Sequence, residues 1–511
     1  MVHVDNNSTG SVKESDIRGA DLRSQMLVFS ICGQVGAGLS LVRRKIAQAL
    51  SSFGYECIAV DVSQVVLERF YEKLTICQNE SAHEDLKSDA SKRIYMLQRR
   101  GNMLRQRFGN DIIARVSLSH VIWPKMESLE GAEPRIAWLI DSVKHDEEVT
   151  FLRELFGDAY FAIGVISTDS VRRRRLMERK GFSEQEFNTL SAIDAKESHF
   201  EHGQSTVKAI TLSDYFFSND YATAENLEVE AQRLLRLIFS VGVETPRLDE
   251  YAMSIAANAA HQSGCLARQV GACIVNSSGQ VIATGRNDVP QFGGGLYTVE
   301  SRKDNRCWVK AGQCYNDLHK MKIVRELVHE ITVSLNLNSE KRENVEDILK
   351  HSRIDSLIEF SRAVHAEMDA LMSIAREEIP GLKGATLYCT TFPCHNCAKH
   401  IIAAGIKRVV YLEPYEKSLA RELHSDAIVN PLLESEDGKI PFDSFGGVAP
   451  ERYSLLFDIN RKRKDREFGK YQDYDSGRQH LTPICAQDEN SIYRKMEKAA
   501  MLLGGNDLEM E

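Results

Sequence analysis

The sequence lacks several features that would place the protein in a membrane or on a polynucleotide. No apolar run approaches the roughly 20 residues that a membrane-spanning helix needs. The N-terminal stretch 1–24 is polar and lacks the apolar core of a signal peptide, so we expect a cytoplasmic protein with no membrane segment. A basic excess is also missing, since 64 Lys and Arg residues stand against 73 Asp and Glu residues. The net charge of −9 and the aromatic content of 8% count against a polynucleotide substrate, although basic runs occur at 172–175 and 461–466.

The composition is that of a globular protein with more than one domain. A chain of 511 residues, 43% hydrophobic and 27% charged, is too long for one ordinary domain. We expect a flexible tail over 1–24, a first domain over 25–240 and a second domain over 248–511. The second domain carries a polar, largely helical insertion at about 301–358. The 11 cysteines of a chain expected in the cytoplasm indicate thiols and metal ligands rather than disulfides.

The first domain opens with a glycine-rich loop between an apolar strand and a helix. The strand is predicted over 26–32, the helix over 41–53, and a second strand over 56–62. This order is typical of a P-loop NTPase-like domain with a parallel sheet, in which backbone N–H groups cradle phosphates. The loop keeps the residues of that pattern at Gly33, Gly36, Gly38 and Ser40. Leu39 stands where the phosphate-binding lysine belongs, so we predict impaired or absent phosphoryl transfer, while the backbone N–H groups of the loop could still bind the phosphates of a nucleotide.

Later segments of the first domain fit the same fold. A strand over 135–141 ends at Asp141, where an acid that organises magnesium would stand. The basic helix 172–180 resembles the lid of nucleoside monophosphate and dephospho-coenzyme A kinases, and 214–219 resembles their late strand. The alternative for the basic helix is a solvated face without a ligand.

The motif that carries the chemistry lies between residues 363 and 411. It consists of His365-Ala-Glu367 followed by Pro393-Cys394-His-Asn-Cys397. One histidine and two thiolates give zinc three protein ligands and leave the fourth tetrahedral position open for water. Glu367 is close enough to pass protons without binding the metal. The alternatives are a closed structural zinc site completed by two other cysteines and a redox dithiol, and neither has a use for Glu367.

The surrounding pattern places this motif on two helices. Residues 384–391 and 406–412 are predicted strands, 395–404 is a predicted helix, and a second helix begins at His365. Two helix N-termini would then converge on one metal, where their positive dipole ends favour thiolate and hydroxide.

Over roughly 248–425 the chain resembles the deoxycytidylate deaminase family. The motifs that carry the resemblance are Val270-Gly271-Ala272, Gly285-Arg-Asn287, His365-Ala-Glu367, Pro393-Cys-His-Asn-Cys397 and Tyr411 to Tyr415. The resemblance implies a cytidine-deaminase-like α/β/α domain that removes the cytosine amino group by hydrolysis. It implies zinc on His365, Cys394 and Cys397 and a proton shuttle at Glu367.

The resemblance also implies two substrate-binding residues, and it makes Arg268 a candidate for a third. Asn287 matches the residue that meets the deoxyribose hydroxyl, and Tyr415 matches an aromatic residue near the base. Many members carry a phosphate-binding arginine where this chain has Ala267, with Arg268 beside it, so the choice between monophosphate and triphosphate stays open. An alternative for Asn287 is a turn residue that bonds its own backbone.

The two-part organisation resembles the bacterial anti-phage dCTP deaminases, called AvcD-like. That resemblance implies dCTP and dCMP as substrates, depletion of cytosine deoxynucleotides during phage infection, and restraint by a small RNA antitoxin. We also expect a homo-oligomer and a nucleotide at the glycine loop. Some deoxycytidylate deaminases carry a second zinc site, for which Cys265, Cys307, Cys314 and His319 are candidates; the alternative is buried free thiols. The rival functions are a polynucleotide cytidine deaminase and a nucleotide-sensing switch whose metal domain is only a scaffold.

Overall fold

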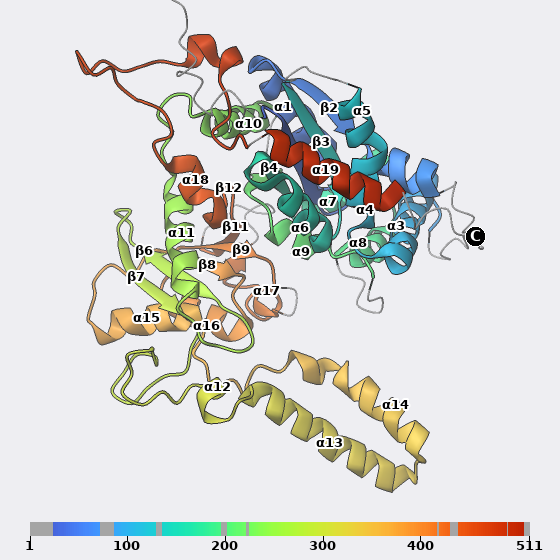
Figure 1. The fold of residues 1–511 in the computed structure, drawn as a ribbon. Coiled ribbons are helices and arrows are strands. Elements are labelled where there is room, and N and C mark those ends of the chain that lie inside the picture. Colours follow the sequence, from blue (N-terminus) through green and yellow to red (C-terminus); the bar gives the residue numbers. More distant parts are fainter. Residues whose placement is uncertain are drawn as a thin grey trace, which may run out of the picture.

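The computed structural model describes most of the chain. The described residues are 24–71, 86–128, 135–195, 202–220, 224–415, 418–429, 438–487 and 489–504. The predicted tail 1–24 lies outside this set except for Ser24. The protein has an α/β architecture with two six-stranded sheets, as the sequence predicts (Figure 1).

The first sheet is parallel apart from one edge strand. Its order is β12-β5-β4-β1-β3-β2, with β12 antiparallel to β5. Its strands are β1 (Leu27–Gly33), β2 (Glu56–Val60), β3 (Ile136–Val143), β4 (Tyr160–Ile166), β5 (Tyr215–Ser218) and β12 (Gly447–Val448). Its helical segments are α1 (Leu39–Ser52), η2 (Ser63–Phe70), α3 (Asp89–Phe108), α4 (Ile112–Ser117), η3 (Leu118–Ile122), α5 (Trp123–Glu127), α6 (Asp146–Phe156), η4 (Gly157–Ala159), α7 (Asp169–Lys180), α8 (Glu184–Ala195), α9 (Thr206–Thr211) and α10 (Ala224–Phe239).

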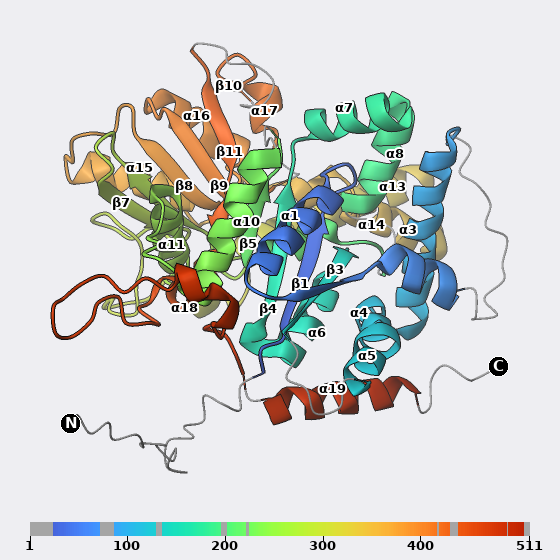
Figure 2. The same cartoon turned by 90° about the horizontal axis from the view of Figure 1, so that it is seen from above.

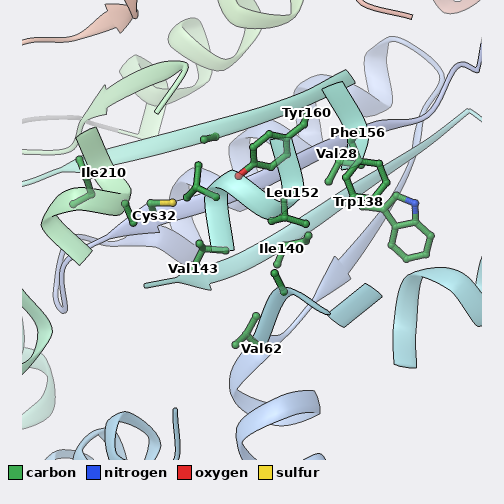
Figure 3. Close-up of a cluster of buried hydrophobic side chains, with 14 of the residues drawn as sticks. Val28, Cys32, Val62, Trp138, Ile140, Val143, Leu152, Phe156, Tyr160 and Ile210 are labelled. Atoms are coloured by element: carbon green, nitrogen blue, oxygen red, sulfur yellow. The ribbon is translucent and has the colours of Figure 1, made fainter. Parts of the chain in front are cut away.

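Helices cover both faces of this sheet because its strands are apolar on both sides. Leu27 and Phe29 of β1 pack in one cluster with residues of α1 and α10. Val28 faces the opposite way and belongs to a second cluster with Trp138 and Tyr160, which residues of η2, α4 and α6 complete (Figure 3). Strands buried on two faces read as continuous hydrophobic runs, which is why the sequence locates them.

The second sheet is mixed. Its order is β10-β11-β9-β8-β6-β7, and β6 runs antiparallel to β7 and β8. Its strands are β6 (Gly271–Val275), β7 (Val281–Arg286), β8 (Thr386–Thr391), β9 (Arg408–Glu413), β10 (Ile428–Val429) and β11 (Ile440–Ser444). Its helical segments are α11 (Leu248–Ala260), α12 (Cys307–Lys310), α13 (Tyr315–Leu335), α14 (Ser339–Lys350), η5 (Arg353–Ser356), α15 (Ala366–Arg376), α16 (His395–Ala403) and α17 (Ala420–Leu423).

Two glycines let helices approach the second sheet very closely. A Cβ on Gly271 of β6 would overlap the backbone of Ala256 in α11, and a Cβ on Gly285 of β7 would overlap the backbone of Ala366 in α15. Helix α11 lies on one face, and α15 and α16 lie on the other. The predicted insertion forms α12, α13 and α14, of which the last two make a hairpin that projects from the domain (Figure 1).

The chain after β11 returns to the first sheet. Val448 of β12 pairs with Tyr215 of β5, and Arg452 bonds Asp158 and Asp214 at 2.8 and 2.9 Å. The remaining segments are η6 (Pro450–Arg452), α18 (Tyr453–Phe457), η7 (Asp475–His480) and α19 (Glu489–Gly504). Helix α19 packs against α4, α5 and α6 (Figure 2). The expected second domain, 248–511, therefore includes a final segment that covers the first sheet.

Among the described residues, none of the helices combines the length and apolar character that a membrane crossing requires.

Candidate active site

His365 and Glu367 stand at the beginning of α15. His365 is the N-cap residue of this helix, with an extended backbone, and Glu367 lies in the first turn. Only 4% of the Glu367 surface is exposed. Burial raises the pKa of its carboxyl group, and the negative charge of the Cys394 thiolate acts in the same direction. A buried acid with a raised pKa is suited to holding and releasing a proton near neutral pH.

The two cysteines of the motif stand at the beginning of α16. Cys394 is the N-cap residue, and its sulfur accepts the N–H of Cys397 at 3.4 Å. The Nδ1 atom of His365 lies 3.4 Å from the sulfur of Cys394 and 3.3 Å from that of Cys397. Hydrogen bonds from the side chain of Cys397 and from His365 outweigh burial and lower the pKa of Cys394 to about 4, which favours the thiolate.

These three side chains fit zinc. Their donor atoms all lie within 4.8 Å of one another, and they comprise one imidazole nitrogen and two sulfurs. Zinc takes this N/S ligand set in tetrahedral sites, and three protein ligands leave one position for water or substrate. The predicted ligands His365, Cys394 and Cys397 are thus brought together by two helix N-termini, as the sequence pattern indicates.

A cavity of about 220 Å³ opens at this group of ligands. His365, Glu367 and Cys394 line it together with Thr391 and Phe392, which lie where β8 ends. The Oγ1 atom of Thr391 is buried and has no hydrogen-bond partner among the described residues. The cavity thus combines apolar lining side chains with a few polar ones, which is typical of small-molecule sites.

Asn287 also lines the cavity, but its side chain is bonded to the backbone. Its Oδ1 accepts the N–H of Val270 at 2.6 Å, and its Nδ2 donates to the carbonyl of Arg268 at 2.8 Å. Asn287 thus fixes the segment that precedes β6. A ligand hydroxyl can still use the second lone pair of Oδ1 or the second hydrogen of Nδ2.

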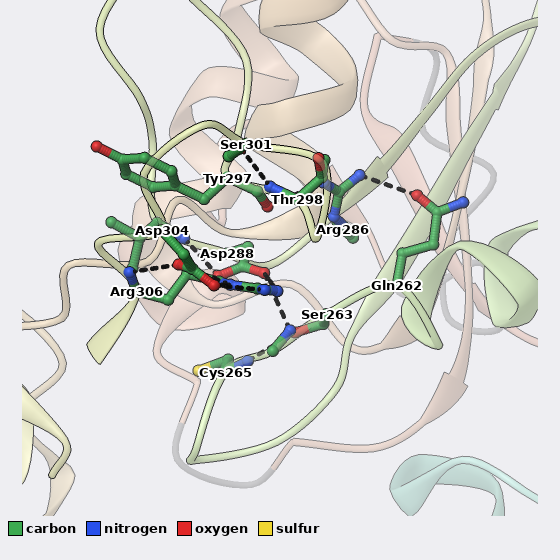
Figure 4. Close-up of polar contacts among 12 residues, drawn as sticks. Gln262, Ser263, Cys265, Arg286, Asp288, Tyr297, Thr298, Ser301, Asp304 and Arg306 are labelled. Carbon is green, nitrogen blue, oxygen red and sulfur yellow. Dashed lines mark hydrogen bonds and ion pairs between the residues drawn. The ribbon is translucent and has the colours of Figure 1, made fainter. Parts of the chain in front are cut away.

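A polar cluster supports the loop after β7. The carboxylate of Asp288 accepts the N–H of Gly264 at 3.0 Å and lies 3.6 Å from Arg306, which itself pairs with Asp304 at 2.7 Å (Figure 4). Ser263 donates to the carbonyl of Asn287 at 2.5 Å. These contacts hold the cavity wall that carries Asn287 in place.

Arg268 and Tyr415 line the same cavity as Asn287. Arg268 forms an ion pair with Glu413 at the end of β9, and 45% of its side chain is exposed. Arg268 is the cationic side chain among the described residues that line this cavity. A phosphate entering the cavity would meet this guanidinium group, at present held by Glu413.

The inserted segment and the residues just after it supply cavity residues to which the sequence analysis gives no substrate-binding role. Cys314, Asn316 and Asp317, at the beginning of α13, line the cavity together with Ile358 and Ser361. The Nδ2 of Asn316 donates to the carbonyl of Leu357 at 2.9 Å. The sequence analysis names Cys314 only as a candidate ligand of a second zinc site, and no motif marks Asn316 or Asp317.

The candidates for a second zinc site do not meet as ligands. Among the described residues, only His365, Cys394 and Cys397 form a group of three or more possible ligands within 4.8 Å. Cys265, Cys307 and Cys314 line one small adjoining cavity. His319 instead stacks on Phe360, with ring centroids 5.4 Å apart.

The glycine loop belongs to the other sheet. Gly33 ends β1, and Gly38 is the N-cap residue of α1 with a φ of 88°. Gly36 also has a positive φ, of 83°. The loop lies between β1 and α1 as predicted, and Ser40 is in the first turn of α1.

Comparison with known proteins identifies the family. The profile of the cytidine and deoxycytidylate deaminase zinc-binding region matches residues 246–413. The deoxycytidylate deaminase of Enterobacteria phage T4 is 32% identical over 168 residues, which are 32% of this chain and 78% of the phage protein. This chain belongs to the cytidine and deoxycytidylate deaminase family.

Two further proteins are similar to the same part of the chain at lower identity. The deoxycytidylate deaminase of Mus musculus is 26% identical over 32% of this chain and 63% of its own length. The dCMP deaminase of cyanophage S-TIM5, solved with dCMP and dUMP, is 21% identical over 40% of this chain, with a TM-score of 0.23. The family match covers residues 246–413, the part of the chain that carries His365, Cys394 and Cys397, and zinc is the cofactor.

Proposed function

We propose that the protein hydrolytically deaminates deoxycytidine nucleotides, dCMP, dCTP or both, to the deoxyuridine nucleotides and ammonia. The observation that supports this most directly is the meeting of His365, Cys394 and Cys397 with the buried Glu367 on one cavity. A metal site with only a structural role would have no use for a buried acid beside its ligands.

In the proposed mechanism the protein's own residues handle the protons. When bound, zinc supplies a Lewis acid that lowers the pKa of a water molecule from 15.7 to about 7. Glu367 accepts a proton from this water and delivers it to N3 of cytosine while the oxygen adds to C4. Glu367 then passes the second proton to the departing amino group, which leaves as ammonia and restores the carboxylate.

The remaining cavity residues would orient the nucleotide. Asn287 would form a hydrogen bond with the deoxyribose hydroxyl through the second lone pair of Oδ1 or the second hydrogen of Nδ2. Tyr415 would stack near the base. Arg268 would break its ion pair with Glu413 and form one with a phosphate of the nucleotide. The relatives' names refer to deoxycytidylate, which favours dCMP among the candidate substrates.

We extend the proposal to the cellular role and to the first domain. By its resemblance to the anti-phage dCTP deaminases, the enzyme would deplete cytosine deoxynucleotides during phage infection, as a cytoplasmic homo-oligomer restrained by a small RNA. The first domain, with Gly33, Gly36, Gly38 and Ser40 as a nucleotide-binding loop, would regulate the deaminase without transferring phosphate.

One assay tests the activity. Purified full-length protein is incubated separately with dCMP, dCTP, CMP, CTP and single-stranded DNA, and uracil products are separated by ion-exchange chromatography. We expect conversion of dCMP, dCTP or both, with ribonucleotides and DNA poor substrates. Preference for CTP over both deoxynucleotides, or for DNA, would refute the proposal. Glu377→Gln, a change at an exposed acid just after α15, serves as the unaffected control for Glu367→Gln.

A further inference from the structure

The glycine loop of the first domain already binds an anion, and that anion is part of the protein. The N–H of Val35, within the loop, donates to Oδ2 of Asp194 at 2.6 Å. Asp194 lies near the end of α8, and only 1% of its surface is exposed. Backbone N–H groups of such loops form concave sites that suit phosphate oxygens. A carboxylate oxygen therefore occupies a position whose chemistry suits a phosphate.

A lysine from another part of the chain stands beside this carboxylate. Lys144, directly after β3, places its Nζ 2.7 Å from Oδ1 of Asp194 and 2.7 Å from the carbonyl oxygen of Gly33. Its side chain is 16% exposed. Lys144 thus places a positive charge beside the loop, which has Leu39 at the position of the usual lysine. Lys144 lies more than 100 positions away from Leu39 in the sequence.

The helix that follows the loop has no side-chain cap. Gly38 is its N-cap residue, so no N-cap side chain accepts the first N–H groups of α1, of which that of Leu41 donates to the carbonyl of Gly38 at 3.1 Å. Asn219, which is 1% exposed, stands against Gly38 and donates from Nδ2 to the carbonyl of Ala37 at 2.7 Å. Its Oδ1 has no partner among the described residues. A buried polar atom without a partner costs free energy, which a ligand at this place would recover.

The α7–α8 hairpin holds the loop from the outside. Arg172 donates to the carbonyl of Val35 at 3.1 Å, and Arg175 donates to that of Ala37 at 3.2 Å. The same hairpin thus contributes both the internal anion and the arginines that would face a bound polyphosphate. If the hairpin moved, the contact between Asp194 and the loop could be replaced by contacts between the loop and a bound phosphate.

We propose that the loop, Lys144 and the N-terminus of α1 form a binding site for the phosphates of a nucleoside triphosphate, and that Asp194 occupies this site when no nucleotide is bound. The incoming phosphate replaces the carboxylate and keeps Lys144 as its partner. Exchanging one anion for another avoids leaving a buried, unpaired charge, which would be strongly unfavourable. The proposal deepens the regulatory role given to the first domain, but it makes no use of the deaminase chemistry.

The test measures ATP binding to the full-length protein by calorimetry. ATP carries no cytosine, so it reports on the first domain and not on turnover. Asp194→Asn keeps an acceptor for Val35 but removes the competing charge, and it should tighten ATP binding by at least ~10-fold. Adding Lys144→Met to that variant should reverse the gain. Glu178→Gln removes one exposed charge from α7 of the same hairpin and should leave the affinity unchanged.

The outcomes separate the proposal from a purely structural ion pair. An Asp194→Asn protein that binds ATP within twofold of wild type, or a Lys144→Met change without effect, overturns it. If Asp194→Asn does not fold, hydrogen exchange of the wild-type protein decides. Saturating ATP should slow exchange over 33–40 and speed it over the end of α8, and unchanged exchange in both segments overturns the proposal. Failure here leaves the deaminase assay untouched.

Discussion

Glu250 of α11 and Arg233 of α10 form a two-pronged ion pair, with both N–O distances at 2.7 Å. The side chains are 0% and 5% exposed. The same carboxylate accepts the N–H of Val448 in β12 at 2.9 Å. The neighbouring Asp249 bonds Tyr388 of β8 at 2.6 Å. Two adjacent acids of one helix therefore connect the first sheet to the sheet that carries the zinc site.

Replacing Glu250 by Gln should destabilise the whole protein. The change removes the carboxylate that pairs most closely with the buried guanidinium of Arg233 and leaves Glu244, whose Oε2 lies 3.6 Å from its Nε. We therefore expect the free energy of unfolding to fall by about 3 kcal/mol. Urea denaturation followed by circular dichroism measures this. Glu228→Gln on α10 breaks only a pair whose acid is 53% exposed, and it should change stability by less than about 1 kcal/mol. Equal losses in the two variants would contradict this account.

Replacing Glu367 by Gln should abolish most of the proposed activity without disturbing the metal site. The amide has the same size but cannot carry the proton from water to the base. We expect deamination to fall by at least ~10²-fold, with zinc content and melting temperature unchanged. Turnover near that of wild type in a zinc-loaded Glu367→Gln protein would exclude the proton shuttle.

Removing one zinc ligand should remove metal and activity together. His365→Ala and Cys394→Ala each leave two protein ligands, too few for a catalytic zinc site. Elemental analysis of the purified variants should show zinc well below that of wild type. Cys57→Ala removes a half-buried thiol from the first domain and should retain both zinc and activity. Full zinc occupancy in both ligand variants would disprove the assignment.

Glu186 of α8 makes stability depend on pH. Burial alone raises the pKa of its carboxyl group, but hydrogen bonds from the N–H groups of Ser183, Ser88 and Lys87 and from the Ser91 hydroxyl outweigh burial and hold the pKa well below its usual range. A depressed pKa stabilises the fold above the unfolded-state pKa of about 4.3, and the effect is lost as pH falls below it.

We therefore expect Glu186→Gln to lower the free energy of unfolding by roughly 2 kcal/mol at neutral pH. The difference from wild type should shrink as the pH falls below about 4.3, because the wild-type carboxylate then loses its charge advantage. Denaturation curves over this pH range measure it, with Glu178→Gln as the exposed control. A difference that stays constant with pH would show that the charge of Glu186 is not the cause.

The sequence predicts features that depend on neighbouring residues. The strand before Gly33, the strand 386–391 and the helices beginning at His365 and Cys394 follow from apolar patterning and helix-start signals, so the fold class is confirmed. The convergence of the three zinc ligands follows from the same local motifs.

Contacts between segments that are far apart in the chain could not be predicted from local sequence patterns. Val448 belongs to a two-residue strand, too short for any periodicity, yet it extends the first sheet. Asn316 reaches the cavity from an insertion without a motif. Leu39 correctly indicates that the loop lacks its lysine, but only the fold shows that Lys144 stands beside the loop.

The ion pair between Arg268 and Glu413 leads to a prediction on substrate binding. Both side chains are partly exposed, so the pair contributes little to stability, and its disruption should leave the melting temperature unchanged. If Arg268 binds the substrate phosphate, Glu413 competes with that phosphate for the same guanidinium group. Glu413→Gln should then lower KM for dCMP or dCTP, whereas Arg268→Ala should raise it by about 10-fold, with kcat changed far less in both variants.

Deoxycytidine, which has no phosphate, provides the matched substrate. Its KM should be insensitive to both changes, because the guanidinium group then has no partner on the ligand. Steady-state kinetics with the nucleoside and the nucleotides separate this role from a general disturbance of the cavity. An Arg268→Ala protein that loses deoxycytidine and dCMP turnover equally would place Arg268 in the structure of the cavity wall and not in phosphate recognition.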